Sequence, residues 1–243
     1  MVNSVQVKRS VSPTLHPANI TSLPGFEGDR GYVQHSADAL NMVYQSIEHV
    51  REARVKLSHD ESRTPKARVL MAAQMADSYL GKIQKTMEAS WGKLSSAIDY
   101  TEAALSKPME EYAGIGNVAT EIRAHLKSMT PSKRVEFLAD AFERADEKTL
   151  KSVLGAPSYL SGMSDIEQQH MTRNYHKRNN PELASRLELM KSVRGKLEQV
   201  KPIIFKEFES AVGASGFEIE KLKATSSSVE AAIVLREFAP SHD

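Results

Sequence analysis

The amino-acid sequence predicts an all-α fold organised around one long, coiled-coil-like antiparallel helical hairpin. Three observations favour this class. Helix-forming residues dominate, while aromatic residues make up only 6% of the chain, which is unfavourable for a large sheet. Apolar residues recur at intervals of three and four over most of the length. Prolines preceded by capping residues mark several helix starts.

The longest expected helix spans residues 64 to 107. Thr64 suits the N-cap, and Pro65 suits the first helical position, where a missing N–H loses no hydrogen bond. No proline follows until Pro108, so this helix should be about 66 Å long at 1.5 Å per residue. Its apolar stripe consists of Val69, Ala76, Leu80, Ile83, Met87, Leu94 and Ile98.

A second apolar row, Trp91, Ile98 and Leu105, lies beside this stripe with a spacing of seven residues. A stripe of that combined width indicates a helix that contacts more than one neighbour. Either the C-terminal half of the chain or a second copy could cover the row. Trp91, Ile98 and Leu105 are therefore candidate subunit contacts.

Residues 1–35 differ in composition from the rest, because prolines and glycines interrupt any long helix or strand. We expect an extended N-terminal arm. Val5, Val7 and Val11 fall on alternate positions, so they could add a short strand to a neighbouring subunit and are candidate subunit contacts. The other interpretation is a leader without fixed structure, which is common at chain termini.

Residues 36–107 should form the hairpin. A first helix over residues 36–58 carries its apolar residues on one side, and the short polar segment after it allows the long helix to fold back antiparallel. Residues 108–243 should form a bundle of shorter helices with a second long helix. The expected elements are helices over residues 117–129, 130 onward, 146–154, 164–179 and 180 onward with a kink near Pro202, a short strand over 217–220, and a final helix from 227.

Charge and composition exclude several classes of protein. The 32 basic and 31 acidic residues leave a formal charge of +1, so no global field attracts nucleic acid or an anionic membrane. The absence of cysteine excludes disulfides and thiolate metal sites. The first residues lack the apolar core of a signal peptide, and no apolar run is long enough to span a membrane. We expect an intracellular setting.

One local segment, residues 170–178, is basic. Arg173, Lys177 and Arg178 could contact phosphate, and Tyr175 could stack on a base, so these four residues are candidate DNA contacts. The other interpretation is a cationic helix C-terminus that complements its own dipole.

No catalytic motif is recognisable. The sequence lacks the HExxH, G-x-S-x-G and Walker patterns, and His170 and His176 are too far apart in register to share a helix face as metal ligands. We therefore expect a protein that is not an enzyme and has no cofactor or bound metal. An active site assembled from distant residues remains the alternative.

Three short segments carry a resemblance to known proteins: Leu154-Gly155-Ala156-Pro157, Leu160-Ser161-Gly162-Met163 and Asn180-Pro181-Glu182-Leu183. Their pattern of residues resembles that of uncharacterised proteins encoded among the structural genes of tailed bacteriophages and prophages. The resemblance implies a virion or morphogenesis setting. Together with the long helix and its two apolar rows, the N-terminal arm and the missing catalytic motifs, it leads us to expect a structural or assembly component of the virion, of the internal (ejection), neck or scaffold type. Such a protein would act through helical oligomerisation and arm exchange, with other virion proteins as partners, in the virion or the host cytoplasm. The alternative is a cytoplasmic helical adaptor that is regulatory or associated with nucleic acid.

Overall fold

The structure is a computed structural model that describes residues 10–109 and 116–233, with side-chain surroundings through residue 229. Every regular element in these ranges is a helix, which confirms the all-α prediction. Among the described helices, none combines the length and apolar character that crossing a membrane requires.

The chain divides into two compact units. Unit 1 comprises residues 1–94 and 192–243, and unit 2 comprises residues 95–191. The sequence placed a boundary after residue 107 and assigned the C-terminal stretch to the second part, whereas in the structure this stretch belongs with the hairpin. The reason is that the apolar side of the second long helix is buried together with that of the hairpin.

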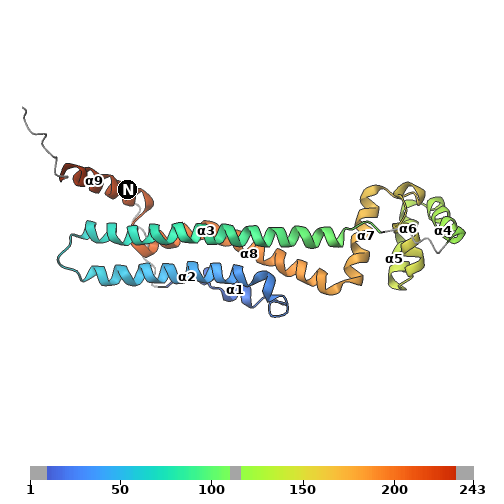
Figure 1. The fold of residues 1–243 in the computed structure, drawn as a ribbon, viewed down its shortest axis with the longest axis horizontal. Helices are drawn as coiled ribbons and strands as arrows, with labels where there is room; N and C mark the ends of the chain where they lie inside the picture. The colour runs from blue at the N-terminus through green and yellow to red at the C-terminus, as the bar shows by residue number, and fades with distance from the viewer. Residues whose placement is uncertain (1–9, 110–115, 234–243) are drawn as a thin grey trace, which may run out of the picture. The chain divides into compact units, whose positions relative to one another are not determined.

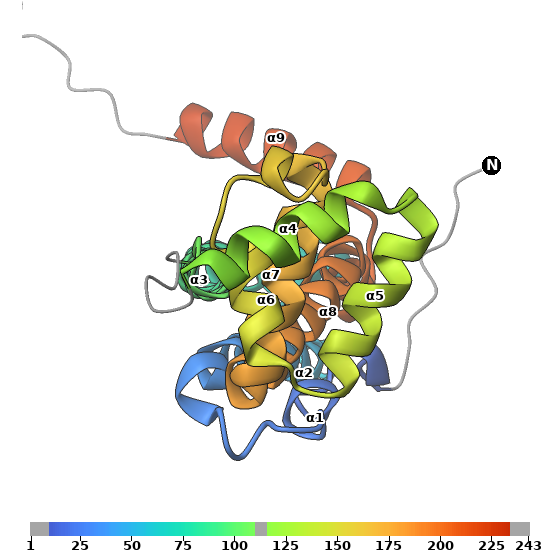
Figure 2. The ribbon, with the colours of Figure 1, turned by 90° about the vertical axis from the view of Figure 1, so that its right-hand side faces the viewer.

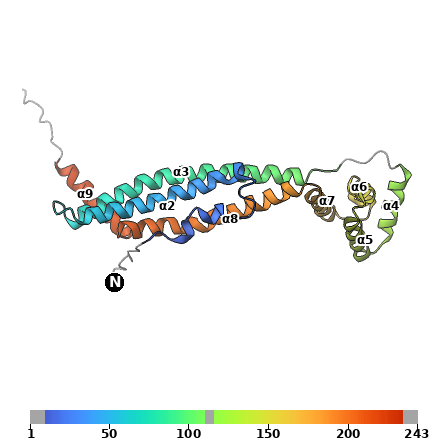
Figure 3. The ribbon, with the colours of Figure 1, turned by 90° about the horizontal axis from the view of Figure 1, so that it is seen from below.

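Unit 1 is built on helices α2 (Arg30–Ser58), α3 (Pro65–Leu105) and α8 (Pro181–Val212), of which α3 and α8 also contribute to unit 2. In unit 1 the three helices lie side by side (Figures 1 and 3). The hairpin is antiparallel, because Ser36 near the start of α2 bonds Ser90 of α3, and His49 further along α2 bonds Tyr79, which comes earlier in α3. Both the hairpin and the long helix are confirmed. The coiled-coil geometry and the kink at Pro202, which lies inside the continuous helix α8, stay predictions.

The core of unit 1 lies between these helices. The residues that recur at intervals of three and four are the buried ones, because this spacing places them on one side of each helix. They include Leu40, Val43, Ile47, Val50, Ile83, Leu94, Val193, Leu197 and Phe208.

The N-terminal segment is not extended where it is described. It contains the 3₁₀ helix η1 (Pro13–Leu15) and helix α1 (Ala18–Thr21), both in contact with α2, and α2 itself begins six residues earlier than expected. The prediction of an extended arm is therefore wrong over residues 10–35. Its apolar side chains explain the difference, since folding back removes them from water. The buried anchors are Val11, Leu15, Ile20 and Phe26.

The C-terminal region forms one helix, α9 (Gly216–Ile233), in place of the expected short strand and later helix. A capping box starts it: Ser215 Oγ accepts from the Glu218 N–H at 3.3 Å, and Glu218 Oε2 accepts from the Ser215 N–H at 2.9 Å. This local signal outweighs the alternation of apolar and acidic residues over 217–220. The strand prediction is wrong for that reason.

Unit 2 contains α4 (Asn117–Ser128), α5 (Pro131–Glu143), α6 (Glu147–Leu154), η3 (Ser158–Leu160) and α7 (Asp165–Asn179) (Figure 2). The short helix α6 contacts α4, α5 and α7 and supplies much of the core of the unit. Two helices of the unit have a side-chain cap: Asp146 caps α6, and Ser164 with Glu167 forms the capping box of α7. Thr130 lies at the N-cap of α5, but its side chain makes no capping hydrogen bond.

Candidate binding groove

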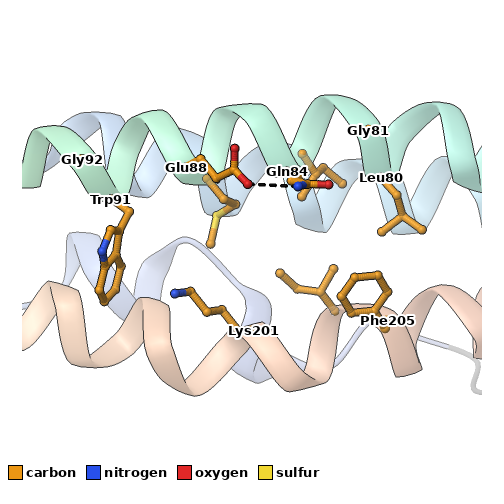
Figure 4. Close-up of a pocket in the computed structure, with 11 residues that line it drawn as sticks. Leu80, Gly81, Gln84, Glu88, Trp91, Gly92, Lys201 and Phe205 are labelled. Carbon is orange, nitrogen blue, oxygen red and sulfur yellow. Dashed lines mark hydrogen bonds between the residues drawn. The ribbon is translucent and has the colours of Figure 1, made fainter.

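A groove of about 710 Å³ lies between α3 and α8 in unit 1 (Figure 4). This volume falls within the range of ligand and peptide pockets. One wall comes from α3 and the other from α8, so residues more than a hundred positions apart in the sequence form it. Its lining is mainly apolar and consists of Leu80, Gly81, Ile83, Gln84, Met87, Glu88, Trp91, Gly92, Lys201, Ile204 and Phe205.

Two glycines open the α3 wall. Gly81 and Gly92 are eleven residues apart, which is close to three helical turns, so they lie on nearly the same side of α3. A Cβ atom added at either position would meet no atom within 4 Å. The wall therefore has free space beside Leu80 and Trp91, which are also eleven residues apart.

On the other wall, Phe205 is 66% exposed, whereas Phe208, one turn later on α8, is 2% exposed. In Figure 4 the Phe205 ring lies across the groove from Leu80. Leaving a large aromatic side chain in water forgoes about 1.5–3 kcal/mol of burial free energy. An exposed aromatic at the edge of an apolar groove is typical of a surface that contacts another molecule.

Each wall carries one charge. The Lys201 ammonium lies 4.0 Å from the centroid of the Trp91 ring, a cation–π contact, and no carboxylate of the described residues pairs with it. On α3, Glu88 accepts a hydrogen bond of 3.0 Å from Gln84. The groove thus offers an apolar floor with a cation on the α8 side and a carboxylate on the α3 side.

The predicted subunit contacts differ in how much of their surface is exposed. Trp91 is half-buried and lines the groove, but Ile98 and Leu105 are each 1% exposed within the chain. Val11 is also buried, with the neighbouring Ser12 N–H donating to Glu207 of α8. Of these four positions, only Trp91 therefore offers accessible surface to a partner. Val5 and Val7 lie outside the described residues.

The four candidate DNA contacts are on α7, but they do not form one exposed surface. Tyr175 is 8% exposed, and its hydroxyl donates a hydrogen bond of 2.6 Å to Glu147 Oε2, so its ring is not free to stack on a base. Burial raises the pKa of Tyr175 to about 12, and the bond to Glu147 adds to the shift. Lys177 pairs with Glu188 at 3.8 Å.

The two arginines of this segment are exposed. Arg173 donates through Nε to Ser106 Oγ at 3.3 Å, and its charge meets no carboxylate among the described residues. Arg178 lies in the last turn of α7, where a cation complements the helix dipole. Arg173 and Arg178 are therefore the members of the predicted set with accessible charge.

A buried polar cluster between α2 and α3 was not predicted from the sequence. Ser90 Oγ lies 3.0 Å from both His35 Nδ1 and Ser36 Oγ. Burial lowers the pKa of His35, and the nearby Lys93 lowers it further, while Asp38 and a backbone hydrogen bond with Tyr32 oppose the shift. Because Ser36 and Ser90 are buried, the cluster acts in helix packing.

In the described part of the chain, no group of three His, Asp or Glu side chains is placed to hold a metal ion.

Sequence reasoning missed Lys201 and Phe205 as members of a site. The apolar spacing of α8 places Ile204 and Phe208 on one side of the helix, but it does not show that Phe205 stays exposed beside α3. The chain matches no family model, no curated protein and no solved structure. Its function is therefore inferred from its own residues and geometry.

Proposed function

We propose that this chain is a non-enzymatic structural protein that self-associates through the α3–α8 groove, as an assembly component of a tailed-bacteriophage particle. The observation that carries the proposal is the exposed Phe205 facing an apolar groove on two long helices. The phage setting, with an internal (ejection), neck or scaffold role and other virion proteins as further partners, rests on the sequence resemblance within residues 130–189.

The groove suits a helix better than a substrate. Its walls are two helices, and helix-in-groove recognition uses apolar anchors at intervals of three, four and seven residues. Its polar groups are few: Gln84 is already bonded to Glu88, and Lys201 lies over the Trp91 ring. Glu88 and Lys201 would therefore orient a bound helix, while the apolar centre of the groove would bury its side chains.

Light scattering on the purified full chain tests the proposal. We expect an oligomer that dissociates when Phe205→Asp places a charge in the groove. The matched control is Ile166→Asp, because Ile166 is 80% exposed and belongs to unit 2, so this variant should remain oligomeric. Wild-type protein that stays monomeric at every concentration would contradict self-association.

A second candidate function, nucleic-acid association, is supported by the exposed charges of Arg173 and Arg178 on α7. It predicts DNA binding whose affinity falls steeply as salt rises. Fluorescence anisotropy with labelled DNA should then show weaker binding for Arg173→Glu combined with Arg178→Glu. Tyr175→Phe should bind as wild type does, because the ring is buried. Absence of wild-type binding at low salt would remove this candidate.

A further inference from the structure

Helix α9 presents a face that stays exposed among the described residues of the chain. Phe217 is 81% exposed, and the exposed residues that follow it at intervals of three, four, seven and eleven lie on the same side of the helix. We call this set the α9 face: Phe217, Glu220, Lys221, Ala224 and Ser228.

The opposite side of α9 is the one that contacts the rest of unit 1. Ile219, Leu222 and Ser226 are half-buried there, and Lys223 pairs with Asp77 of α3 at 2.8 Å. None of the residues that line the groove belongs to α9, so the described part of α9 does not fill the groove of its own chain. Unit 1 therefore carries, apart from the groove, a separate exposed face with one large apolar side chain, Phe217.

We propose that the α9 face of a second copy occupies the α3–α8 groove. This inference rests on the proposed self-association and identifies the element that fills the groove. Phe217 would enter the apolar end of the groove that is lined by Leu80, Ile204 and Phe205.

The charges of the two surfaces then match. Glu220 follows Phe217 by three residues, about 4.5 Å along a helix, and Lys201 precedes Ile204 by the same interval. An α9 that runs antiparallel to α8 places the Glu220 carboxylate at the Lys201 ammonium. The Glu220 side chain is 73% exposed, and its partner Lys223 retains Asp77 when Glu220 turns to the groove.

The spacing of residues along α9 and along α3 matches as well. Phe217 and Ser228 are eleven residues apart, as are Gly81 and Gly92, which is about 16.5 Å on each helix. With Phe217 at the level of Gly81, Ser228 meets Gly92, and Ala224 lies between them. Small side chains on α9 against glycines on α3 allow the two helices to approach closely.

This contact is head-to-tail, because the groove and the α9 face are different surfaces of one chain. Each copy that docks its α9 still has an open groove, so assembly continues until a ring closes or a filament forms. Such growth is consistent with the proposed structural role.

Mixing two complementary variants tests the inference by light scattering. Phe217→Asp removes the α9 face but keeps the groove, and Phe205→Asp removes the groove but keeps the α9 face. We expect each variant alone to be monomeric and their mixture to form a dimer of twice the chain mass that grows no further. Circular dichroism should show unchanged helix content, because both positions are exposed.

A charge reversal tests the register. Lys201→Glu should weaken assembly, and adding Glu220→Lys in the same chain should restore it. Val229→Asp is the matched control, since Val229 is 56% exposed on α9 but lies outside the α9 face.

The outcomes separate this inference from the proposed function. A Phe217→Asp variant that assembles as wild type does, or a mixture that stays monomeric, would overturn the docking of α9 while leaving self-association through the groove intact. Monomeric wild-type protein would overturn both.

Discussion

Arg51 of α2 and Glu207 of α8 form an ion pair in the core of unit 1, with 3.9 Å between Nη2 and Oε2. The Glu207 side chain has no exposed surface, and the Arg51 side chain is 10% exposed. The Ser12 N–H donates to the same Oε2 atom at 3.2 Å. One buried carboxylate thus holds three segments of the chain together.

Removing this carboxylate should destabilise the protein strongly. We expect Glu207→Ala to lower the free energy of unfolding by about 3–5 kcal/mol, because Arg51 keeps a buried charge without its partner. Urea unfolding followed by circular dichroism measures the change. The double variant Arg51→Met with Glu207→Leu should lose less than Glu207→Ala alone; an equal or larger loss would show that charge pairing is not the cause.

Two phenylalanines on α8 provide a test of burial. Phe208→Ala should lower the free energy of unfolding by about 3–5 kcal/mol, because its ring is buried and its removal leaves a cavity. Phe205→Ala should change it by no more than about 0.5 kcal/mol, because its ring is exposed. Chemical unfolding of the two variants at low protein concentration measures both values. A large loss for Phe205→Ala would place that residue in the core.

The bond between Tyr175 and Glu147 predicts a loss of stability at alkaline pH. The pKa of Tyr175 is raised from its usual value of 10 to about 12, so the folded state holds the phenolic proton more tightly. This contribution is fully present below pH 10 and is lost as the pH rises toward 12. Tyr175→Phe should lower stability at neutral pH by about 1 kcal/mol. It should also flatten the pH dependence of unfolding between about pH 10 and 12, because phenylalanine has no phenolic proton to lose; an unchanged slope would contradict this role.

His35 predicts a loss of stability at acidic pH. Burial lowers its pKa below the usual 6.5, so the unfolded state binds the proton at a higher pH than the folded state does. Stability should therefore decrease as the pH falls through 6.5, while above this value the contribution is fully present. Urea unfolding at several pH values measures the effect. His35→Gln cannot titrate and should show a smaller decrease, so an identical decrease in both proteins would assign the effect to other groups.

The ends of most helices could be predicted from the sequence because short-range chemistry decides them. Pro65 and Pro181 begin α3 and α8, and Ser164 with Glu167 begins α7, since each signal satisfies or removes N–H groups within one turn. Ser215 and Glu218 carry the same local signal for the start of α9, whereas the alternation over residues 217–220 favours a strand; the capping box decides the outcome.

The candidate site could be predicted only in part. Trp91 was identified because its spacing places it beside the apolar stripe of α3. Lys201 and Phe205 were not, because their exposure depends on how α8 lies against α3. Tyrosine is a residue type that can stack on a base, but Tyr175 is buried against Glu147. This burial follows from the packing of α7 on α6.

The sequence by itself determined the all-α class, the hairpin and the starts of most helices, because propensity, capping and apolar periodicity act over a few residues. Only the tertiary structure decided which apolar side chains stay exposed. In the folded chain the N-terminal residues Val11 and Leu15 are buried in the core, whereas Phe205 and Phe217 stay exposed to water. Residues 192–233 belong with the hairpin in unit 1. The physical reason is that burial depends on contacts between distant segments, which local spacing does not specify.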